Sequence, residues 1–276
     1  MTHRPIRLAL LATGFALTQG AHAQTDEGPP RWELGAVGLA VSQQAYPGSD
    51  QQLGRVRVLP YALYRGRWLR ADGETVGLRA ARTAQWELDI GAAASFGGGG
   101  DDIEARRGMQ RLGNLVEFGP RLKWRLGEGS TSGGWRLALP LRGVFDLSDR
   151  LRHRGWALEP ELTRGWRPAE GWRTSMSLGA IVADRTLADT FYGVKTSQAT
   201  ALRPAYQARS GLVAWRLSAS FNRELNRDWR VFGFVRTDSL AGAANRASPL
   251  VKQTTGTTVG LGVSVTLARS SASGVD

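Results

Sequence analysis

The chain has no cysteine, and only three of its 276 residues are histidines. Without cysteine there can be neither a disulfide framework nor a lipid anchor on a thiol. Two of the histidines lie in the first 23 residues, which leaves His153 for the rest of the chain. Nucleophilic catalysis most often needs a histidine beside the nucleophile. His153 has Ser148, Asp146 and Asp149 nearby, but Ser and Asp are ordinary turn residues. The sequence predicts a protein that is not an enzyme and uses no cofactor.

Long apolar runs are also missing. A membrane-spanning helix needs about 18 to 20 apolar residues in a row, and no segment after the N-terminal region offers them. The N-terminal run Ile6–Leu17 is shorter, has Arg4 and Arg7 at its start, and is followed by Ala21-His22-Ala23. This arrangement is typical of a secretory signal peptide. We therefore predict a signal peptide over residues 1–23, cleaved after Ala23, and we exclude a helical inner-membrane protein.

Metal and phosphate motifs are weak as well. Asp101, Asp102 and Glu104 could offer oxygens to a cation, but Arg106, Arg107 and Arg111 follow closely and the spacing of a calcium-binding loop is absent. Gly97–Gly100 lacks the Lys-Ser/Thr of a phosphate-binding loop. We interpret this segment as a charged outer loop and predict no metal site.

What the chain does have is alternation of apolar and polar residues. In Trp86–Phe96, Trp86, Leu88 and Ile90 share one face and Glu87 and Asp89 the other. The same pattern covers Val116–Leu126, Trp135–Leu147, Trp156–Trp166 and Trp172–Val182. A period of two is typical of a strand. About ten residues with aromatic ends suit a tilted strand that crosses a bilayer. The predicted fold is all-β, an antiparallel transmembrane β-barrel in a Gram-negative outer membrane.

Loop lengths and tryptophan positions together predict twelve strands, within a range of ten to fourteen. The expected strands are 31–42, 55–64, 67–72, 75–81, 86–96, 113–126, 135–146, 155–166, 172–184, 206–224, 229–240 and 256–268. Short turns alternate with long loops, and in outer-membrane barrels the short turns face the periplasm. Eight of the ten tryptophans then form a periplasmic girdle: Trp32, Trp68, Trp86, Trp124, Trp135, Trp166, Trp172 and Trp229.

Residues 24–30 are expected to be a short periplasmic segment, 31–268 the barrel and 269–276 a tail. Barrels of this kind usually end on an aromatic residue, whereas the last strand here ends on the aliphatic Val265 and Leu267.

The expected lumen is charged. Its predicted inward charges are Glu87, Asp89, Glu117, Arg121, Lys123, Arg125, Arg136, Arg142, Glu159 and Glu161. Counting from the turns places Glu87 and Asp89 opposite Lys123 and Arg121, and Arg142 near Glu159, so we expect cross-strand pairs. The charges either form a paired network that fills the barrel or line a pore that selects small anions. The loop 185–205 could fold inward and narrow the lumen.

The chain is basic, with a formal net charge of +12. A basic exterior favours anionic lipids or phosphate-bearing glycolipid, so outer-membrane lipids and lipopolysaccharide are the expected partners. An exported protein does not meet nucleic acid, so we do not expect nucleic acid as a partner. The other interpretation of the charge is an arginine-lined lumen that pairs with glutamates.

Several short motifs carry a family resemblance. They are Tyr46-Pro47-Gly48-Ser49-Asp50, Asn114–Pro120, Phe191-Tyr192-Gly193-Val194 and Ser248-Pro249-Leu250-Val251. Their order resembles the outer-membrane family of the MltA-interacting protein MipA and OmpV over nearly the whole chain. The resemblance implies a non-enzymatic protein, in one branch a scaffold that links a lytic transglycosylase to peptidoglycan synthesis through cell-wall enzymes in the periplasm. Other branches imply a small-solute channel or a loop-borne adhesin.

Overall fold

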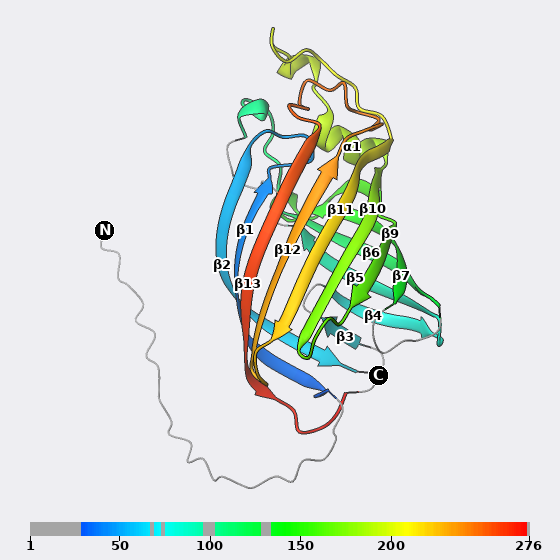
Figure 1. The fold of residues 1–276 in the computed structure, drawn as a ribbon. Helices are drawn as coiled ribbons and strands as arrows, with labels where there is room; N and C mark the ends of the chain where they lie inside the picture. Colours follow the sequence, from blue (N-terminus) through cyan, green and yellow to red (C-terminus); the bar gives the residue numbers. More distant parts are fainter. Residues whose placement is uncertain (1–28, 67–68, 73–74, 96–102, 128–133, 275–276) are drawn as a thin grey trace, which may run out of the picture.

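A computed structural model describes residues 29–66, 69–72, 75–95, 103–127 and 134–274. The strands are β1 (Trp32–Gln44), β2 (Gln52–Arg65), β3 (Leu69–Asp72), β4 (Thr75–Arg82), β5 (Trp86–Ser95), β6 (Leu115–Leu126), β7 (Trp135–Asp146), β8 (Arg152–Leu158), β9 (Glu161–Trp166), β10 (Trp172–Ala183), β11 (Gly211–Glu224), β12 (Trp229–Ser239) and β13 (Thr255–Arg269). Neighbouring strands are antiparallel, and β13 pairs with β1, so the sheet closes into a barrel (Figure 1).

The prediction of twelve strands is confirmed, because β8 and β9 are two halves of one strand. Both pair with β7 on one side and with β10 on the other. The break falls at Glu159 and Pro160, and proline has no N–H to donate to a ladder. The Pro160 carbonyl still accepts from Ala180 N at 3.0 Å, which keeps the two halves in one wall.

The connection between β10 and β11 differs from the expectation. β11 begins at Gly211 rather than near residue 206, and the segment before it contains an unpredicted helix, α1 (Arg185–Tyr192). Asp184 caps α1 by accepting from Leu187 N at 2.8 Å. Eight residues are too few to show a helical period clearly among strands, so the sequence pattern did not indicate this helix. Among the described residues, no helix is long and apolar enough to cross a membrane.

The two ends of the barrel differ in their connections. The turns between β9 and β10 and between β11 and β12 are short, whereas the connection between β10 and β11, which contains α1, and that between β12 and β13 are long. We call the long-loop end the outer end and the other the periplasmic end, as in outer-membrane barrels. The start of the tail pairs with the start of β1: Ser270 N donates to Trp32 O at 3.0 Å and Arg31 N to Ala272 O at 2.8 Å.

Aromatic rings cover glycines on neighbouring strands of the closing sheet. Phe232 and Phe234 on β12 lie over Gly262 and Gly260 on β13, where a Cβ atom would come within 2.3 Å of each ring. Only glycine leaves space for a ring on the strand surface, and such pairs fix strand register. The lumen side of this wall is therefore held by packing as well as by the hydrogen-bonded ladder.

The tryptophans lie at two levels. Of the predicted periplasmic girdle, Trp32, Trp86, Trp124, Trp135, Trp166, Trp172 and Trp229 all stand at strand ends on the periplasmic side, while Trp68 falls outside the described residues. Trp156 and Trp215 lie in the outer halves of the continuous β8–β9 strand and of β11, and each is almost half exposed. Aromatic side chains at both ends match the two interfaces of a membrane.

Opposite faces of one strand should respond differently to a new charge. Leu178, in the middle of β10, is 55% exposed between Leu162 and Leu217 on the outward face. Leu178→Arg is expected to lower the free energy of unfolding in lipid vesicles by about 2–4 kcal/mol, because the charge enters hydrocarbon. The matched variant Ser177→Arg points inward, where Ser177 donates to Glu161, and should cost less. A larger loss for Ser177→Arg would reverse the assigned faces.

Candidate functional site: the outer cap and the lumen

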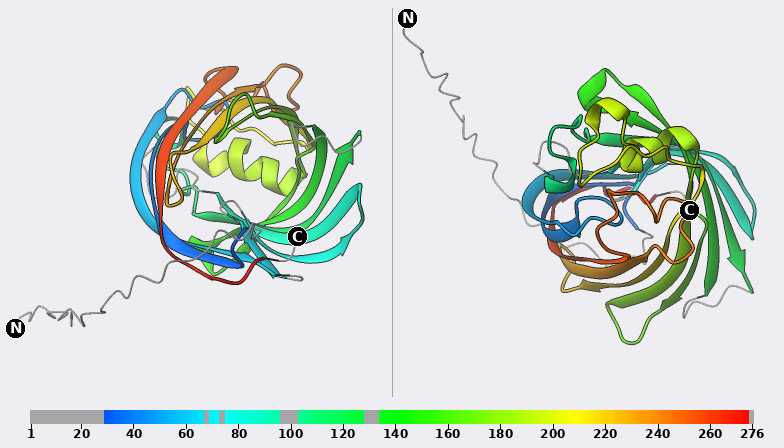
Figure 2. Two further views of the ribbon diagram at one scale, coloured as in Figure 1. Left: turned by 60° about the horizontal axis from the view of Figure 1, so that its bottom comes forward. Right: turned by 90° about the horizontal axis from the view of Figure 1, so that it is seen from above.

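The outer end of the barrel is closed by a packed cap, formed by residues 45–51, 103–114, 184–210 and 240–254. Viewed along the barrel, α1 lies inside the ring of strands (Figure 2). Leu187, Ala188 and Tyr192 of α1 are buried, with at most 4% exposure. The main hydrophobic core of the protein is here, and it also includes Tyr46, Ile103, Leu112, Val194, Leu240 and Leu250 together with inward residues of the strands. The core thus joins the cap to the barrel wall.

Three of the family-like motifs meet in the cap although they are far apart in sequence. Tyr192 Oη donates to Pro47 O at 2.9 Å, and Ser248 Oγ donates to Tyr192 O at 2.8 Å. Tyr46 Oη donates to Leu250 O at 2.6 Å. Each hydrogen bond joins a side chain of one motif to the backbone of another. These residues therefore hold three outer loops together.

Gly48 and Ser49 are the tightest part of this junction. Gly48 has a φ of +94°, and a Cβ there would meet Leu240 at 3.0 Å. Glycine adopts this backbone conformation without strain. Ser49 is fully buried, and its carbonyl accepts from Gln44 Nε2 at 2.6 Å and from Gln253 Nε2 at 2.8 Å. The first loop is thereby fixed against both β1 and the last loop.

The two tyrosines remain hydrogen-bond donors over a wide pH range. Burial raises the pKa of Tyr46 to about 12. Burial also raises the pKa of Tyr192. A buried phenol avoids the charged form because desolvation penalises it. Both hydroxyls are therefore protonated at neutral pH, and the bonds that hold the cap do not depend on titration there.

Two arginines connect the segment after β5 to the segment around α1. Arg106 Nη1 donates to Phe191 O at 2.8 Å. Arg203 Nη1 donates to Ala105 O at 3.1 Å and to Arg107 O at 2.9 Å. Arginine has five donors and suits carbonyl clusters of this kind. The cap is therefore a single connected unit of four outer segments.

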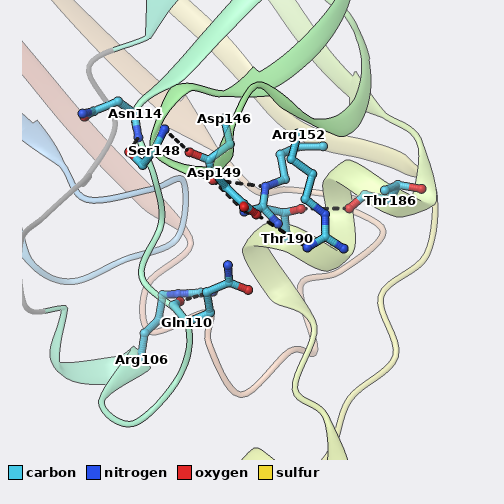
Figure 3. Close-up of polar contacts among 10 residues, drawn as sticks. Arg106, Gln110, Asn114, Asp146, Ser148, Asp149, Arg152, Thr186 and Thr190 are labelled. Atoms are coloured by element: carbon cyan, nitrogen blue, oxygen red, sulfur yellow. Dashed lines mark hydrogen bonds and ion pairs between the residues drawn. The ribbon is translucent and has the colours of Figure 1, made fainter.

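The start of β8 contacts α1, and Asp146, Ser148, Asp149 and His153 lie in or beside the turn that precedes it. Figure 3 shows Asp149 and Arg152 beside Thr186 and Thr190 of α1, with Ser148 next to Asn114. Asp146 is 2% exposed and accepts from Arg154 Nη2 at 2.6 Å, while Ser148 Oγ accepts from Asn114 N at 3.1 Å.

His153 lies on the other face of the sheet, with its ring 5.2 Å from Phe145 and 5.6 Å from Trp156. Asp146 and His153 are therefore separated by the barrel wall. Among the described residues, no group of three His, Cys, Asp or Glu side chains could hold a metal ion; Asp101 and Asp102 fall outside them.

The lumen contains the charge pairs expected between β5 and β6. Glu87 faces Lys123 and Asp89 faces Arg121, as the spacing predicted. Asp89 accepts from Arg121 Nε at 3.0 Å and from Nη2 at 2.9 Å, and Lys123 Nζ lies 2.8 Å from the same carboxylate. Glu87 accepts from Lys123 at 3.3 Å. Bidentate arginine–carboxylate contacts are strong and directional, so this part of the lumen is well ordered.

Arg142 and Glu159 each form an ion pair with a residue other than the expected one. Arg142 Nη1 lies 2.7 Å from Glu117 Oε2, a diagonal contact, because Glu117 is directly opposite Val144. Glu159 is instead 4.0 Å from Arg216. Glu161 accepts from Thr163 and Ser177, both at 3.1 Å, rather than from an arginine. Arg125 and Arg136 lie opposite each other and are exposed at the periplasmic end.

A second charge cluster beneath the cap was missed from the sequence. Arg216 on β11 donates to both carboxylate oxygens of Asp238 on β12, at 2.8 and 3.0 Å. Asp238 is 5% exposed, and Arg236 lies 3.9 Å from it. Period-two alternation places Arg216, Arg236 and Asp238 on the inward face of β11 and β12, so this pattern is the sequence signal for the cluster.

Exposure of the inward residues changes along the barrel. At the outer end, Ala214, Val144 and Ala157 are at most 3% exposed. Toward the periplasmic end, Ser220 and Arg136 face inward and are exposed. The lumen is therefore closed at the cap and accessible to solvent from the periplasmic end.

A closed antiparallel barrel with a polar lumen, an apolar outward face and aromatic girdles defines an outer-membrane β-barrel protein. The family described as MltA-interacting protein MipA matches residues 35–267, and the chain belongs to this family. No curated protein matches the chain.

Solved structures that resemble the chain include the NanC porin, with 9% identity and a TM-score of 0.41 over 85% of this chain and 100% of that chain. A bacterial polysaccharide outer membrane secretin has 10% identity and a TM-score of 0.41 over 86% and 99%. A Pseudomonas aeruginosa FadL homologue has 9% identity and a TM-score of 0.30 over 88% and 91%.

Proposed function

We propose that this protein is a non-enzymatic scaffold of the outer membrane that binds a cell-wall enzyme, a lytic transglycosylase, at its periplasmic end. The observation that carries the proposal is the asymmetry of the barrel. The cap closes the outer end with a buried core, whereas inward side chains near the periplasmic end stay exposed. The family description, MltA-interacting protein, supports a partner of this class.

The accessible lumen enlarges the surface that a periplasmic partner can reach. The turns at this end are short, for example residues 167–171 and 225–228. Inward residues such as Arg136, Arg173 and Ser220 add to them, because each is exposed at this end of the barrel. A segment of the partner that enters the periplasmic mouth of the barrel would contact arginine side chains as well as serine hydroxyl groups. This mode of binding needs no large periplasmic loop.

The proposal is tested by blocking one end of the barrel at a time. The protein is placed in lipid nanodiscs, and binding of a purified lytic transglycosylase from the same bacterium is measured by biolayer interferometry. A bulky peptide tag inserted in the turn 167–171 should abolish binding. The same tag inserted at Arg209, on the outer side, should leave the affinity unchanged. The scaffold proposal would be contradicted if the untagged protein did not bind the transglycosylase, or if the two tags reduced its binding equally.

A small-solute channel is the second candidate. It is favoured by the polar lumen wall, where Ser175 and Ser220 hydroxyls lie 2.8 Å apart beside charged strands. For transport the cap would have to move, since it blocks the outer end. Single-channel conductance of the unmodified protein in planar bilayers separates the two functions.

A further inference from the structure

The periplasmic rim carries arginines on its lipid-facing side over β7, β9, β10 and β11. Arg164 lies directly opposite Trp135, and Arg223 directly opposite Trp172. Trp166 follows Arg164 on the same face of β9. We call Trp135, Arg164, Trp166, Trp172 and Arg223 the inner-rim patch. Both arginines are exposed, and Trp135 and Trp166 are 42% and 36% exposed.

The guanidinium groups rest on the tryptophan rings. Arg164 Cζ is 5.2 Å from the ring centre of Trp135 and 5.8 Å from that of Trp166. Arg223 Cζ is 5.0 Å from the ring centre of Trp172. Stacking over an aromatic face holds a guanidinium by cation–π attraction and leaves its in-plane N–H donors pointing outward. The two arginines are thus oriented toward the membrane interface.

The surrounding surface offers these cations no acidic side chain on the same face. The outward residues of β7, β9, β10 and β11 that the structure describes are apolar, aromatic, small or basic, with no carboxylate among them. Glu224, next to Arg223, points inward and contacts Arg173 at 2.8 Å. Glu170, in the neighbouring turn, is exposed to solvent. The complementary charge must therefore come largely from outside the protein.

The arginines are not a general feature of the girdle. On the other side of the rim, Trp86 and Trp124 face each other across β5 and β6. The outward described positions of these two strands hold apolar residues only. The tryptophan-stacked arginines therefore lie on the arc from β7 to β11, and elsewhere on the rim Arg31 Cζ lies 5.7 Å from the ring centre of Tyr64.

We propose that the inner-rim patch binds the headgroup of an anionic phospholipid of the periplasmic leaflet. A phosphate accepts two parallel N–H bonds from a guanidinium, and the tryptophan rings pack against the glycerol and the first acyl carbons. A cation at the interface of a barrel costs little, and attraction to anionic lipid makes it favourable. This inference does not depend on the proposed partner protein.

The test is native mass spectrometry of the full mature protein in detergent, with phosphatidylglycerol or phosphatidylcholine added. The dissociation constant of the first bound phosphatidylglycerol should be lower by roughly five-fold for each arginine that contacts it. Arg164→Gln with Arg223→Gln should bring the two lipids to equal affinity. Arg209→Gln with Arg246→Gln, in the outer loops, removes the same charge and should leave the preference intact.

The heat-dependent shift of the barrel on a denaturing gel confirms that each variant is folded. Equal affinity of the unmodified protein for the two lipids would overturn the proposal. So would a preference that persists in Arg164→Gln/Arg223→Gln, or one that the outer-loop variant loses as well, because the effect would then follow net charge rather than the patch.

Discussion

Tyr192→Ala is expected to turn a silent barrel into a conducting one. Tyr192 is 1% exposed, and its hydroxyl and carbonyl join the first and last outer loops through Pro47 and Ser248. Removing a buried aromatic ring typically costs about 3–5 kcal/mol. Here the substitution destabilises the cap, while the backbone hydrogen bonds between the barrel strands are unaffected. The cap should open and expose the lumen from both ends.

Single-channel recording in planar bilayers measures this effect. The unmodified protein should give no steps, and Tyr192→Ala should give frequent openings. Tyr192→Phe keeps the ring and loses one hydrogen bond, worth about 1 kcal/mol, so it should remain mostly silent. Tyr64→Ala, at the periplasmic rim, is the control for loss of a tyrosine elsewhere. Steady conductance of the unmodified protein would favour the channel function over the scaffold.

Asp238→Ala is expected to destabilise the barrel by about 3 kcal/mol or more. The substitution leaves Arg216 and Arg236 close together without their shared carboxylate, and Arg216 is only 20% exposed. Breaking one partner of a buried ion pair strands the other charge, which costs about 3–5 kcal/mol. Urea unfolding in lipid vesicles, followed by tryptophan fluorescence, gives the free energy.

Replacing both partners should cost less than replacing one. Arg216→Met with Asp238→Leu removes the stranded charge, so part of the lost stability should return. The pair Arg173–Glu224 is a matched control at 2.8 Å, with side chains 56% and 37% exposed. Exposed pairs contribute about 0–1 kcal/mol, so Glu224→Ala should have little effect. Strict additivity at Arg216 and Asp238 would instead indicate a wide, water-filled lumen.

The sequence by itself determined the strands and their faces. Alternation of period two, tryptophans at strand ends and short turns between pairs gave twelve strands, because these are local properties of a chain that crosses a bilayer with its backbone paired. Counting from the turns also placed Asp89 opposite Arg121 and Glu87 opposite Lys123, as the structure shows. In an antiparallel barrel, the strand lengths and the turns set the register. The residue that faces a given position can therefore be found by counting along the chain.

Only the tertiary structure decided which charges touch and how the outer end is closed. Arg142 reaches diagonally to Glu117, because strand twist and a long side chain bring a neighbour two positions away within reach. The cap depends on Tyr46, Tyr192 and Ser248, which lie up to about two hundred residues apart. Their contacts follow from barrel closure, which brings the outer loops to one mouth. No local sequence pattern predicts these contacts, because they form only after β13 has paired with β1.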